Sequence, residues 1–303
     1  MSLTEKTFKN GEEIIKAGDI GRSFFLLTEG KAGVYADYEK NNPFRIAVLE
    51  PGEYFGEMAI LEAYPRNATV VAVGNVHVIE ITADELQPFF NEHPEQVFEL
   101  MKHLGSRIHT MTDDYNESQA LLKEVHEADT EKKSESFFSK IKKHISLYQS
   151  NKNTIAEPNT ESLQKSVSNS AVEESDDMIA FQKGMPIFNE GEIGESMYIL
   201  RSGSVGLYKN YGESDQIKSS ELTAVSVFGV MGMVNEEPRS ATAIAESDNT
   251  LIEYLDQNDI QDLIHSDPGK IEMILRLMSY RLRRLNIEFL KNCKEITESY
   301  DNK

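Results

Sequence analysis

The stretch "EYFGEMAILEAYPRNATV", residues 53–70, contains the residues from which both the fold and the functional site are most directly predicted. Gly56 precedes an acidic residue, Glu57, and a run of small and aliphatic side chains; Arg66 follows Pro65 near the other end. Glycine permits a tight turn where a strand would meet a short helix, and proline fixes the backbone beside the arginine. The stretch therefore places one carboxylate and one guanidinium on either side of an apolar segment.

The chemistry of these residues predicts a ligand. The segment from Glu57 to Leu61 predicts one helical turn, whose free N–H groups would favour an anion. Arg66 can donate charge-assisted hydrogen bonds to a phosphate, whereas Glu57 would be repelled by that phosphate unless it accepted a hydrogen bond from a neighbouring hydroxyl. A ribose hydroxyl meets this condition, so the pair predicts a site for a phosphorylated sugar. The alternative is a buried ion pair that only ties the fold together, although such pairs stabilise weakly.

The chain contains this pattern twice. Phe8 and Phe181 are 173 positions apart (181 minus 8). The same offset relates Gly21 to Gly194, Gly30 to Gly203, Gly56 to Gly229, Pro65 to Pro238, Arg66 to Arg239 and Thr69 to Thr242. After Glu80 and Glu253, one extra residue in the second copy aligns Pro94 with Pro268. Because one register holds over so many positions, the sequence predicts a duplicated domain.

Each copy has β-rich segments first and a helical segment last. Short apolar runs punctuated by glycines predict a β-roll, and apolar residues at helical spacing after Pro94 and Pro268 predict a long amphipathic helix. The predicted fold class is mixed β and α, with two β-roll (double-stranded β-helix or jelly-roll) barrels, each followed by such a helix. The predicted organisation is a first domain at 1–112, a helical and then disordered linker at 113–175, and a second domain at 176–298.

Within the linker, residues 135–148 have an apolar face at helical spacing. Its members are Phe137, Phe138, Ile141, Ile145 and Tyr148. We expect this face to pack on the chain's own domain or on a partner helix. The neighbouring lysines keep a weaker membrane-surface interpretation open.

Composition excludes several classes of protein. The 303 residues include 31 Lys and Arg against 51 Asp and Glu, a formal charge of −20, which is the opposite of what a nucleic-acid-binding face requires. The single cysteine, Cys293, fits a reducing compartment, and the sequence contains neither a secretory apolar region nor a membrane-spanning run. It also lacks recognisable metal-ligand spacing and catalytic motifs. We therefore expect a cytoplasmic protein that is not an enzyme, with no metal, no cofactor, and neither nucleic acid nor membrane as a partner.

The segment "FGEMAIL" (55–61), followed by "PRNAT" (65–69), resembles the phosphate-binding cassette of cyclic nucleotide-binding domains, as in catabolite activator proteins and protein kinase A regulatory subunits. The resemblance covers residues 1–112 and 176–298. It implies that Arg66 and the backbone near Gly56, Met58, Ala59 and Ala68 bind the cyclic phosphate, that Glu57 binds the ribose 2′-hydroxyl, that Asn67 lies where the purine is chosen, and that Thr112 is the polar residue of a lid helix. Because Asn67 is neither small and apolar nor hydroxylated, the purine stays open, and cAMP is preferred over cGMP only as the commoner ligand of the family.

The second copy, "SVFGVMGMVNEEPRSATA" (226–243), has Val230 where the first has Glu57. Without that acceptor, a bound ribose would lose a hydrogen bond worth about 1.5–3 kcal/mol, or roughly ten- to a hundred-fold in affinity. The corresponding candidate residues are Gly229, Met231, Gly232, Arg239, Ser240 and Ala241, and we expect weak or absent binding there. The asymmetry predicts one domain that senses a ligand and one that transmits, docks or dimerises.

The leading functional hypothesis is a cyclic nucleotide receptor that transmits binding in the first domain to a protein partner through movement of the lid helix. A structural protein with empty pockets and an inhibitor similar to a kinase regulatory subunit are the alternatives. A transcription factor would need a DNA-binding domain after the last helix, and the chain ends at Lys303. The partner is not predicted, and a homodimer through the long helices stays open.

Overall fold

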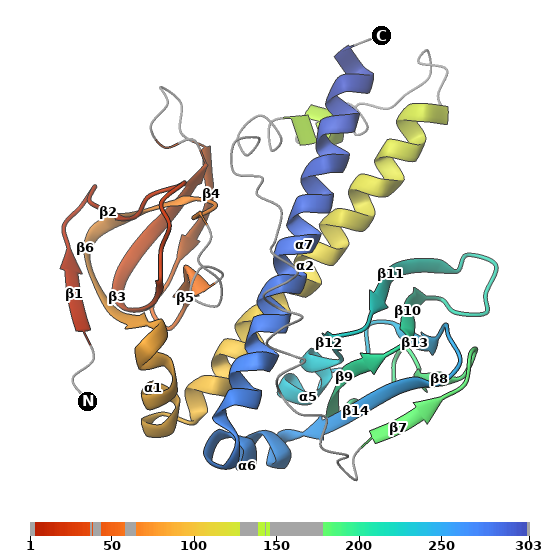
Figure 1. Cartoon of the computed structure of the whole chain (residues 1–303). Coiled ribbons are helices and arrows are strands. Elements are labelled where there is room, and N and C mark those ends of the chain that lie inside the picture. The colour runs from red at the N-terminus through yellow and green to blue at the C-terminus, as the bar shows by residue number, and fades with distance from the viewer. Residues whose placement is uncertain are drawn as a thin grey trace. The chain divides into compact units, whose positions relative to one another are not determined.

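The structure, a computed structural model (Figure 1), describes residues 4–36, 38, 44–57, 65–127, 139–142, 144–145 and 178–301. Its contacts divide the chain into two compact units. The first comprises Met1–Leu86, Asp113–Pro158 and Arg283–Lys303, and the second comprises Gln87–Thr112 and Asn159–Leu282. Most of the predicted linker, including residues 151–175, lies outside the described residues, so the predicted domain boundaries stay a prediction.

The first unit contains a rolled six-stranded sheet. Its strands are β1 (Thr4–Phe8), β2 (Glu13–Ile15), β3 (Ser23–Ala36), β4 (Phe44–Leu49), β5 (Tyr54–Phe55) and β6 (Thr69–Thr82). The long strands β3 and β6 pair antiparallel from Ser23 opposite Thr82 to Tyr35 opposite Thr69, with register shifts on either side of Glu29, the second of them at Gly30. Gly30 has φ 85°, and a Cβ there would lie 2.2 Å from the Asn75 carbonyl oxygen, so this bend requires glycine.

The second unit contains two four-stranded sheets, in the orders β11-β10-β13-β8 and β12-β9-β14-β7. Their strands are β7 (Met178–Phe181), β8 (Pro186–Phe188), β9 (Ser196–Ser202), β10 (Ser204–Lys209), β11 (Ile217–Thr223), β12 (Ser226–Phe228), β13 (Thr242–Ala245) and β14 (Thr250–Asp256). The apolar cores of the two rolls correspond: Phe25 stacks on Phe55 at 5.2 Å, and their counterparts Tyr198 and Phe228 stack at 5.2 Å. The β-roll fold is confirmed twice, as rolled sheets and not as closed barrels.

The long helices are confirmed as well. After the 3₁₀ turn η2 (Ala83–Glu85) and α1 (Leu86–Glu92), helix α2 spans Glu95–Glu127; in the second copy, α6 (Gln257–Ser266) precedes α7 (Pro268–Asp301). The helices have 33 and 34 residues and begin at or just after the prolines that the sequence aligns. Proline is favoured there because the first helical turn has no intrahelical use for its missing N–H. None of the helices in the described part of the chain is long and apolar enough to cross a membrane.

The C-terminal parts of α2 and α7 lie side by side within the first unit (Figure 1). The Asn292 side-chain amide donates to the Ser118 hydroxyl across 2.8 Å, and both residues are buried. They are 174 positions apart (292 minus 118), the offset that also aligns Pro94 with Pro268. Equivalent positions of the two copies therefore meet, so the two helices run parallel and form a pseudosymmetric pair inside one chain.

Part of the predicted apolar face at 135–148 joins this helix pair. Ile141 is buried in one cluster with Leu121, Val125 and Ile296, and Ile145 packs against it. The other predicted members, Phe137, Phe138 and Tyr148, lie outside the described residues. Ile141 and Ile145 therefore pack on the chain's own helices, which is one of the two outcomes expected from the sequence.

Substituting Ser118→Ala should lower the free energy of unfolding by about 1–3 kcal/mol, because the buried Asn292 amide would lose its acceptor. Denaturant unfolding monitored by helical circular dichroism measures this change. The neighbouring exposed variant Gln119→Ala serves as the control and should stay within about 0.5 kcal/mol of the natural protein. Equal changes for the two variants would contradict a buried contact between the helices.

Candidate functional site

Arg66 lies beneath the turn that ends β5, and only 7% of its surface is exposed. Its Nη1 donates to the Gly56 carbonyl across 2.6 Å and its Nη2 to the Ser23 carbonyl across 2.5 Å. A Cβ at Gly21 would lie 2.2 Å from Nη2, and one at Gly56, where φ is 78°, would lie 2.6 Å from Nη1. The two glycines therefore leave the space that the guanidinium fills, with the backbone wrapped closely around it.

The backbone of Arg66 is fixed independently of its side chain. Its N–H donates to the Asp19 carbonyl across 2.9 Å, and its own carbonyl accepts from the Gly18 N–H across 2.9 Å. Pro65, next to it, forms an isolated bridge with Ile20. Since both the backbone and the guanidinium are held, the direction of the side chain is preorganised, as a site that receives an anion requires.

A buried carboxylate accompanies this cation. Glu57 directly follows Gly56 and is 1% exposed. Burial is the largest influence on Arg66 and lowers the pKa of its guanidinium below the ordinary value, while the negative charges of Glu57, Glu80 and Asp19 offset part of this effect. The guanidinium has five N–H donors, and the two carbonyl bonds use two of them. The structure thus describes a buried cationic donor and a buried acidic side chain in one cassette, and their roles toward a ligand stay predictions.

Five candidate residues of the first cassette lie in two described stretches: Gly56 and Glu57 follow β5, and residues 66–68 precede β6. Asn67 and Ala68 follow Arg66, are half-buried, and lead into β6 at Thr69, whose hydroxyl accepts from the Ala17 N–H across 3.1 Å. Met58 and Ala59 lie outside the described residues. Thr112 lies on α2 within the second compact unit, where its hydroxyl donates to the Ile108 carbonyl of its own helix across 2.7 Å. Its role as a lid residue stays a prediction.

The second cassette repeats the arginine geometry. Arg239 is 6% exposed and donates to the Gly229 carbonyl across 2.6 Å and to the Ser196 carbonyl across 2.7 Å. A Cβ at Gly194 would lie 2.3 Å from its Cζ, and Gly229 has φ 74°. Burial again is the main reason why the pKa of Arg239 lies below its ordinary value. Both arginines therefore support their own rolls, whatever else they bind.

The surroundings of Arg239 differ from those of Arg66. The guanidinium lies 4.5 Å from the centre of the Phe188 ring and 5.3 Å from that of Tyr198. Such cation–π contacts are worth about 0.5–2 kcal/mol each and hold the charge against the roll. The counterpart of Phe188 in the first copy is Ile15, whose aliphatic side chain has no aromatic face. Besides its two hydrogen bonds to backbone carbonyls, Arg239 is thus also held by two aromatic rings of the chain.

The remaining candidates of the second cassette surround this arginine. Helix α5 (Val230–Asn235) takes up the segment after Gly229, and Val230 is only 6% exposed. A Cβ at Gly232 would lie 2.6 Å from the Nη1 of Arg239, so no larger residue fits there without a shift of the guanidinium. Met231 is half-buried, Ala241 is buried and Ser240 is exposed. An apolar side chain therefore fills the position of the first cassette's carboxylate.

Several residues that build these sites were not predicted from the sequence. Gly21 and Gly194 make room for the arginines, and Ser23 and Ser196 provide carbonyl acceptors. Their recurrence at the offset of 173 positions was the available signal. Every residue has a backbone carbonyl, however, so residue type does not show which carbonyl accepts a hydrogen bond. The repeat alone could not distinguish these positions from the other matching ones.

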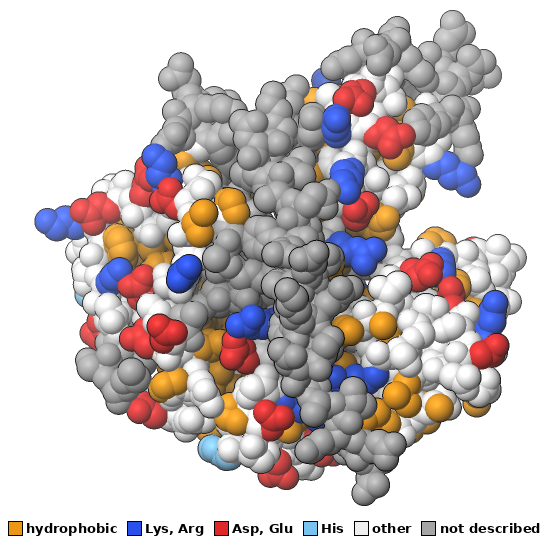
Figure 2. All heavy atoms as spheres, in the orientation of Figure 1, with side chains coloured by type: hydrophobic (Ala, Val, Ile, Leu, Met, Phe, Trp, Pro, Cys, Tyr) orange, Lys and Arg blue, Asp and Glu red, His pale blue; other side chains and the backbone are white. Residues whose placement is uncertain are grey.

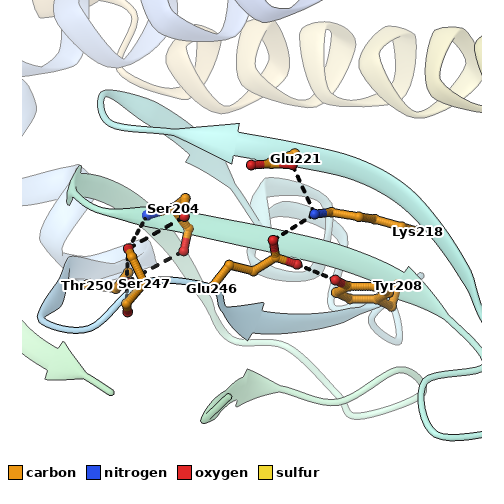
Figure 3. Close-up of polar contacts among 7 residues, drawn as sticks. All are labelled: Ser204, Tyr208, Lys218, Glu221, Glu246, Ser247 and Thr250. Carbon is orange, nitrogen blue, oxygen red and sulfur yellow. Dashed lines mark hydrogen bonds and ion pairs between the residues drawn. The ribbon is translucent and has the colours of Figure 1, made fainter. Parts of the chain in front are cut away.

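A polar network in the second roll was also not predicted (Figure 3). Glu246 accepts from the Lys218 ammonium across 2.7 Å and from the Tyr208 hydroxyl, and Lys218 also pairs with Glu221 across 2.9 Å. Although burial raises the pKa of Glu246, the bonds from Lys218 and Tyr208 bring it below the ordinary value. The counterpart of Glu246 in the first roll is Val73, which is exposed. The network stabilises strands outside the cassette and marks a second difference between the copies.

Charges are mixed over the face of the molecule drawn in Figure 2. Acidic side chains lie interspersed with basic ones among the described residues of that face. The excess of acidic residues in the whole chain, 51 against 31, makes the average field negative. A bound phosphate would therefore depend on the local buried arginine and not on the general field.

Comparison with known families agrees with the rolls and the cassettes. The family model of the cyclic nucleotide-binding domain matches residues 5–93 and 178–267, one stretch for each copy. The chain belongs to the cyclic nucleotide-binding domain family, with two such domains in tandem. The resemblance inferred from the cassette motif is thereby confirmed.

Similar proteins include kinases and kinase subunits. The chain is 26% identical to a cGMP-dependent protein kinase of Toxoplasma gondii over 79% of this chain and 18% of that protein. It is 26% identical to a cAMP-dependent protein kinase regulatory subunit of Debaryomyces hansenii over 80% of this chain and 41% of that protein. Among solved structures, the regulatory domain of Toxoplasma gondii PKA with cAMP is 20% identical, covers 88% of this chain and 86% of its own, and has a TM-score of 0.27. The chain spans less than half the length of the curated relatives that it matches.

Proposed function

We propose that this chain is a cyclic nucleotide receptor that binds its ligand in the first domain, residues 1–112, and does not catalyse a reaction. The observation that supports this proposal most strongly is the presence, in a family cassette, of the buried carboxylate of Glu57 next to Gly56, whose carbonyl accepts from the preorganised guanidinium of Arg66. Arg66 binds the cyclic phosphate together with backbone groups from Gly56 to Ala59 and at Ala68. Glu57 accepts a hydrogen bond from the ribose 2′-hydroxyl.

The ligand is cAMP in preference to cGMP. Relatives named for each nucleotide match the chain, a cGMP-dependent kinase and cAMP-dependent kinase regulatory subunits, so the relatives alone do not decide between the two purines. Asn67 beside Arg66 is the residue that we propose to face the purine. Calorimetric titration of the full chain with each nucleotide tests this preference, and tighter binding of cGMP would overturn it.

Binding acts through α2, the long helix that follows the first roll, with Thr112 as its polar contact to the base. A ligand shifts such an equilibrium only by the difference between its affinities for the two positions of the helix. The second domain, residues 176–298, binds nucleotide weakly or not at all. We propose that this chain acts in the cytoplasm on a protein partner. Two alternatives are a structural role with empty pockets, which calorimetry without heat would favour, and inhibition of a kinase, which co-purification with a kinase catalytic subunit would favour.

Substituting Glu57→Val copies the second cassette into the first and should weaken nucleotide binding roughly ten- to a hundred-fold, because the ribose hydroxyl would lose a charged acceptor. Titration calorimetry of the full chain measures the change. A 2′-deoxy cyclic nucleotide is the matched control on the ligand side, since it should bind the natural protein and the variant with similar affinity. A variant that binds the ribose nucleotide as tightly as the natural protein would remove Glu57 from the site.

A further inference from the structure

Helix α2 has one glycine among its 33 residues, Gly105, and this glycine is buried. Glycine weakens a helix interior, so its presence there calls for a reason in the packing. A Cβ at this position would lie 2.6 Å from the Sδ of Met231 and 3.7 Å from a methyl carbon of Val230. The missing side chain thus lets α2 approach α5, the helix of the second cassette.

The surfaces that meet are apolar on both sides. Met101 and Ile108 lie four and three positions from Gly105, on the same face of α2, and both are buried. On α5, Val230 and Met233 are buried, and Met231 reaches the glycine. Residues Gln87–Thr112 belong to the same compact unit as the second roll. The N-terminal half of the helix that follows the first roll therefore packs with the second roll.

Val230 occupies the position that Glu57 has in the first copy. A carboxylate at this place would be buried against the apolar face of α2 and would carry a large desolvation penalty. The same substitution that removes the acceptor for a ribose hydroxyl therefore supplies an apolar contact for a helix. Valine at this position therefore removes a ligand contact and adds a packing contact with α2.

Helix α5 is also anchored to the helices of its own domain. Arg281 of α7 donates to the Val227 carbonyl across 3.0 Å, just before α5 begins, and Gln257 of α6 donates to the Met233 carbonyl across 2.6 Å. A shift of α2 against α5 would therefore be passed to α6 and α7 and not absorbed by a loose turn.

We propose that the second cassette is a helix-docking site whose partner is the N-terminal half of α2, seated by Gly105 against Met231 and Val230. In the second cassette, a helix of the same chain takes the place that we propose for a nucleotide in the first. The regulatory consequence rests on the proposed function: when a nucleotide in the first domain moves α2, α5 receives the movement and the second domain needs no ligand. The docking itself does not depend on nucleotide.

Hydrogen exchange of the full chain tests this proposal through the variant Gly105→Leu. Leucine should displace Met231 and raise the exchange rates of amides in both α5 and residues 97–108 by about tenfold or more, as expected when a local opening becomes easier. Adding Met231→Ala should restore much of the protection by making room. The control is Ser106→Leu, the same bulk at the neighbouring exposed position, which should leave α5 unchanged.

Faster exchange in α2 with unchanged exchange in α5 would overturn the proposal, and so would equal effects of the two leucine variants. If Gly105→Leu does not fold, the pair Gly105→Cys and Met231→Cys replaces it. Its oxidation should form an intrachain disulfide, which neither single variant forms, and failure to form one would count against docking. Nucleotide titration of the natural protein is a separate readout: its failure would remove the proposed receptor function and leave the exchange result standing.

Discussion

Replacing Arg66 with alanine is expected to weaken nucleotide binding at least about 100-fold, because a phosphate would lose charge-assisted hydrogen bonds worth about 1.5–3 kcal/mol each. The variant should also lose stability, because the Arg66 side chain holds the backbone of its own roll. The bonds from Arg66 to the Gly56 and Ser23 carbonyls would be lost as well. Calorimetric titration measures binding, and thermal unfolding without ligand measures the structural loss.

Arg239→Ala is the matched control for this experiment. It removes the equivalent bonds, to the Gly229 and Ser196 carbonyls, from an arginine that is buried to the same degree. Both variants should therefore lose stability, whereas only Arg66→Ala should lose nucleotide binding. Equal loss of binding from the two variants would show that the second cassette also holds the ligand.

The second large effect is expected from Val230→Glu, which restores to the second cassette the acidic residue of the first. Because residue 230 is buried beside Gly105 of α2, the new carboxylate would be desolvated against an apolar helix, and Arg239, already held by two carbonyls and two aromatic rings, should offset only part of this cost. We expect the second roll to be destabilised by about 3–5 kcal/mol. Denaturant unfolding, with hydrogen exchange of α5 to locate the change, is the measurement. We expect no second nucleotide site to appear.

Val230→Ile separates charge from shape at this position. It keeps the residue apolar with one added methylene and should cost at most about 1–3 kcal/mol by overpacking. A Val230→Glu variant that stays as stable as Val230→Ile and binds a second nucleotide would contradict the assignment of α5 to helix docking. It would show instead that a single side chain separates the two cassettes.

Much of the fold was predictable because its signals are local or repeated. The glycines that punctuate the strands predicted the rolls, and Pro94 and Pro268 marked the starts of α2 and α7 within a residue or two. The single register of the two copies predicted the tandem arrangement that the family match confirms. These features depend on backbone conformation and on side-chain spacing, both of which residue type records directly.

The contacts between distant segments were less predictable. The pairing of Ser118 with Asn292 requires knowing that the long helices run parallel, and two amphipathic faces do not reveal their partners. The seat of Gly105 on α5 was hidden because a single glycine within a helix has several possible causes. Even the arginine environment was predicted only in part, since its acceptors are backbone carbonyls. Residue type specifies what a side chain can do more readily than which distant group it meets.

The most direct test of the whole account is the stoichiometry of cAMP binding to the full natural chain, measured by calorimetric titration of well-folded protein. We expect heat from a single site per chain, abolished by Arg66→Ala and retained by Arg239→Ala. Two sites of similar affinity, or the absence of heat with both cAMP and cGMP, would contradict it.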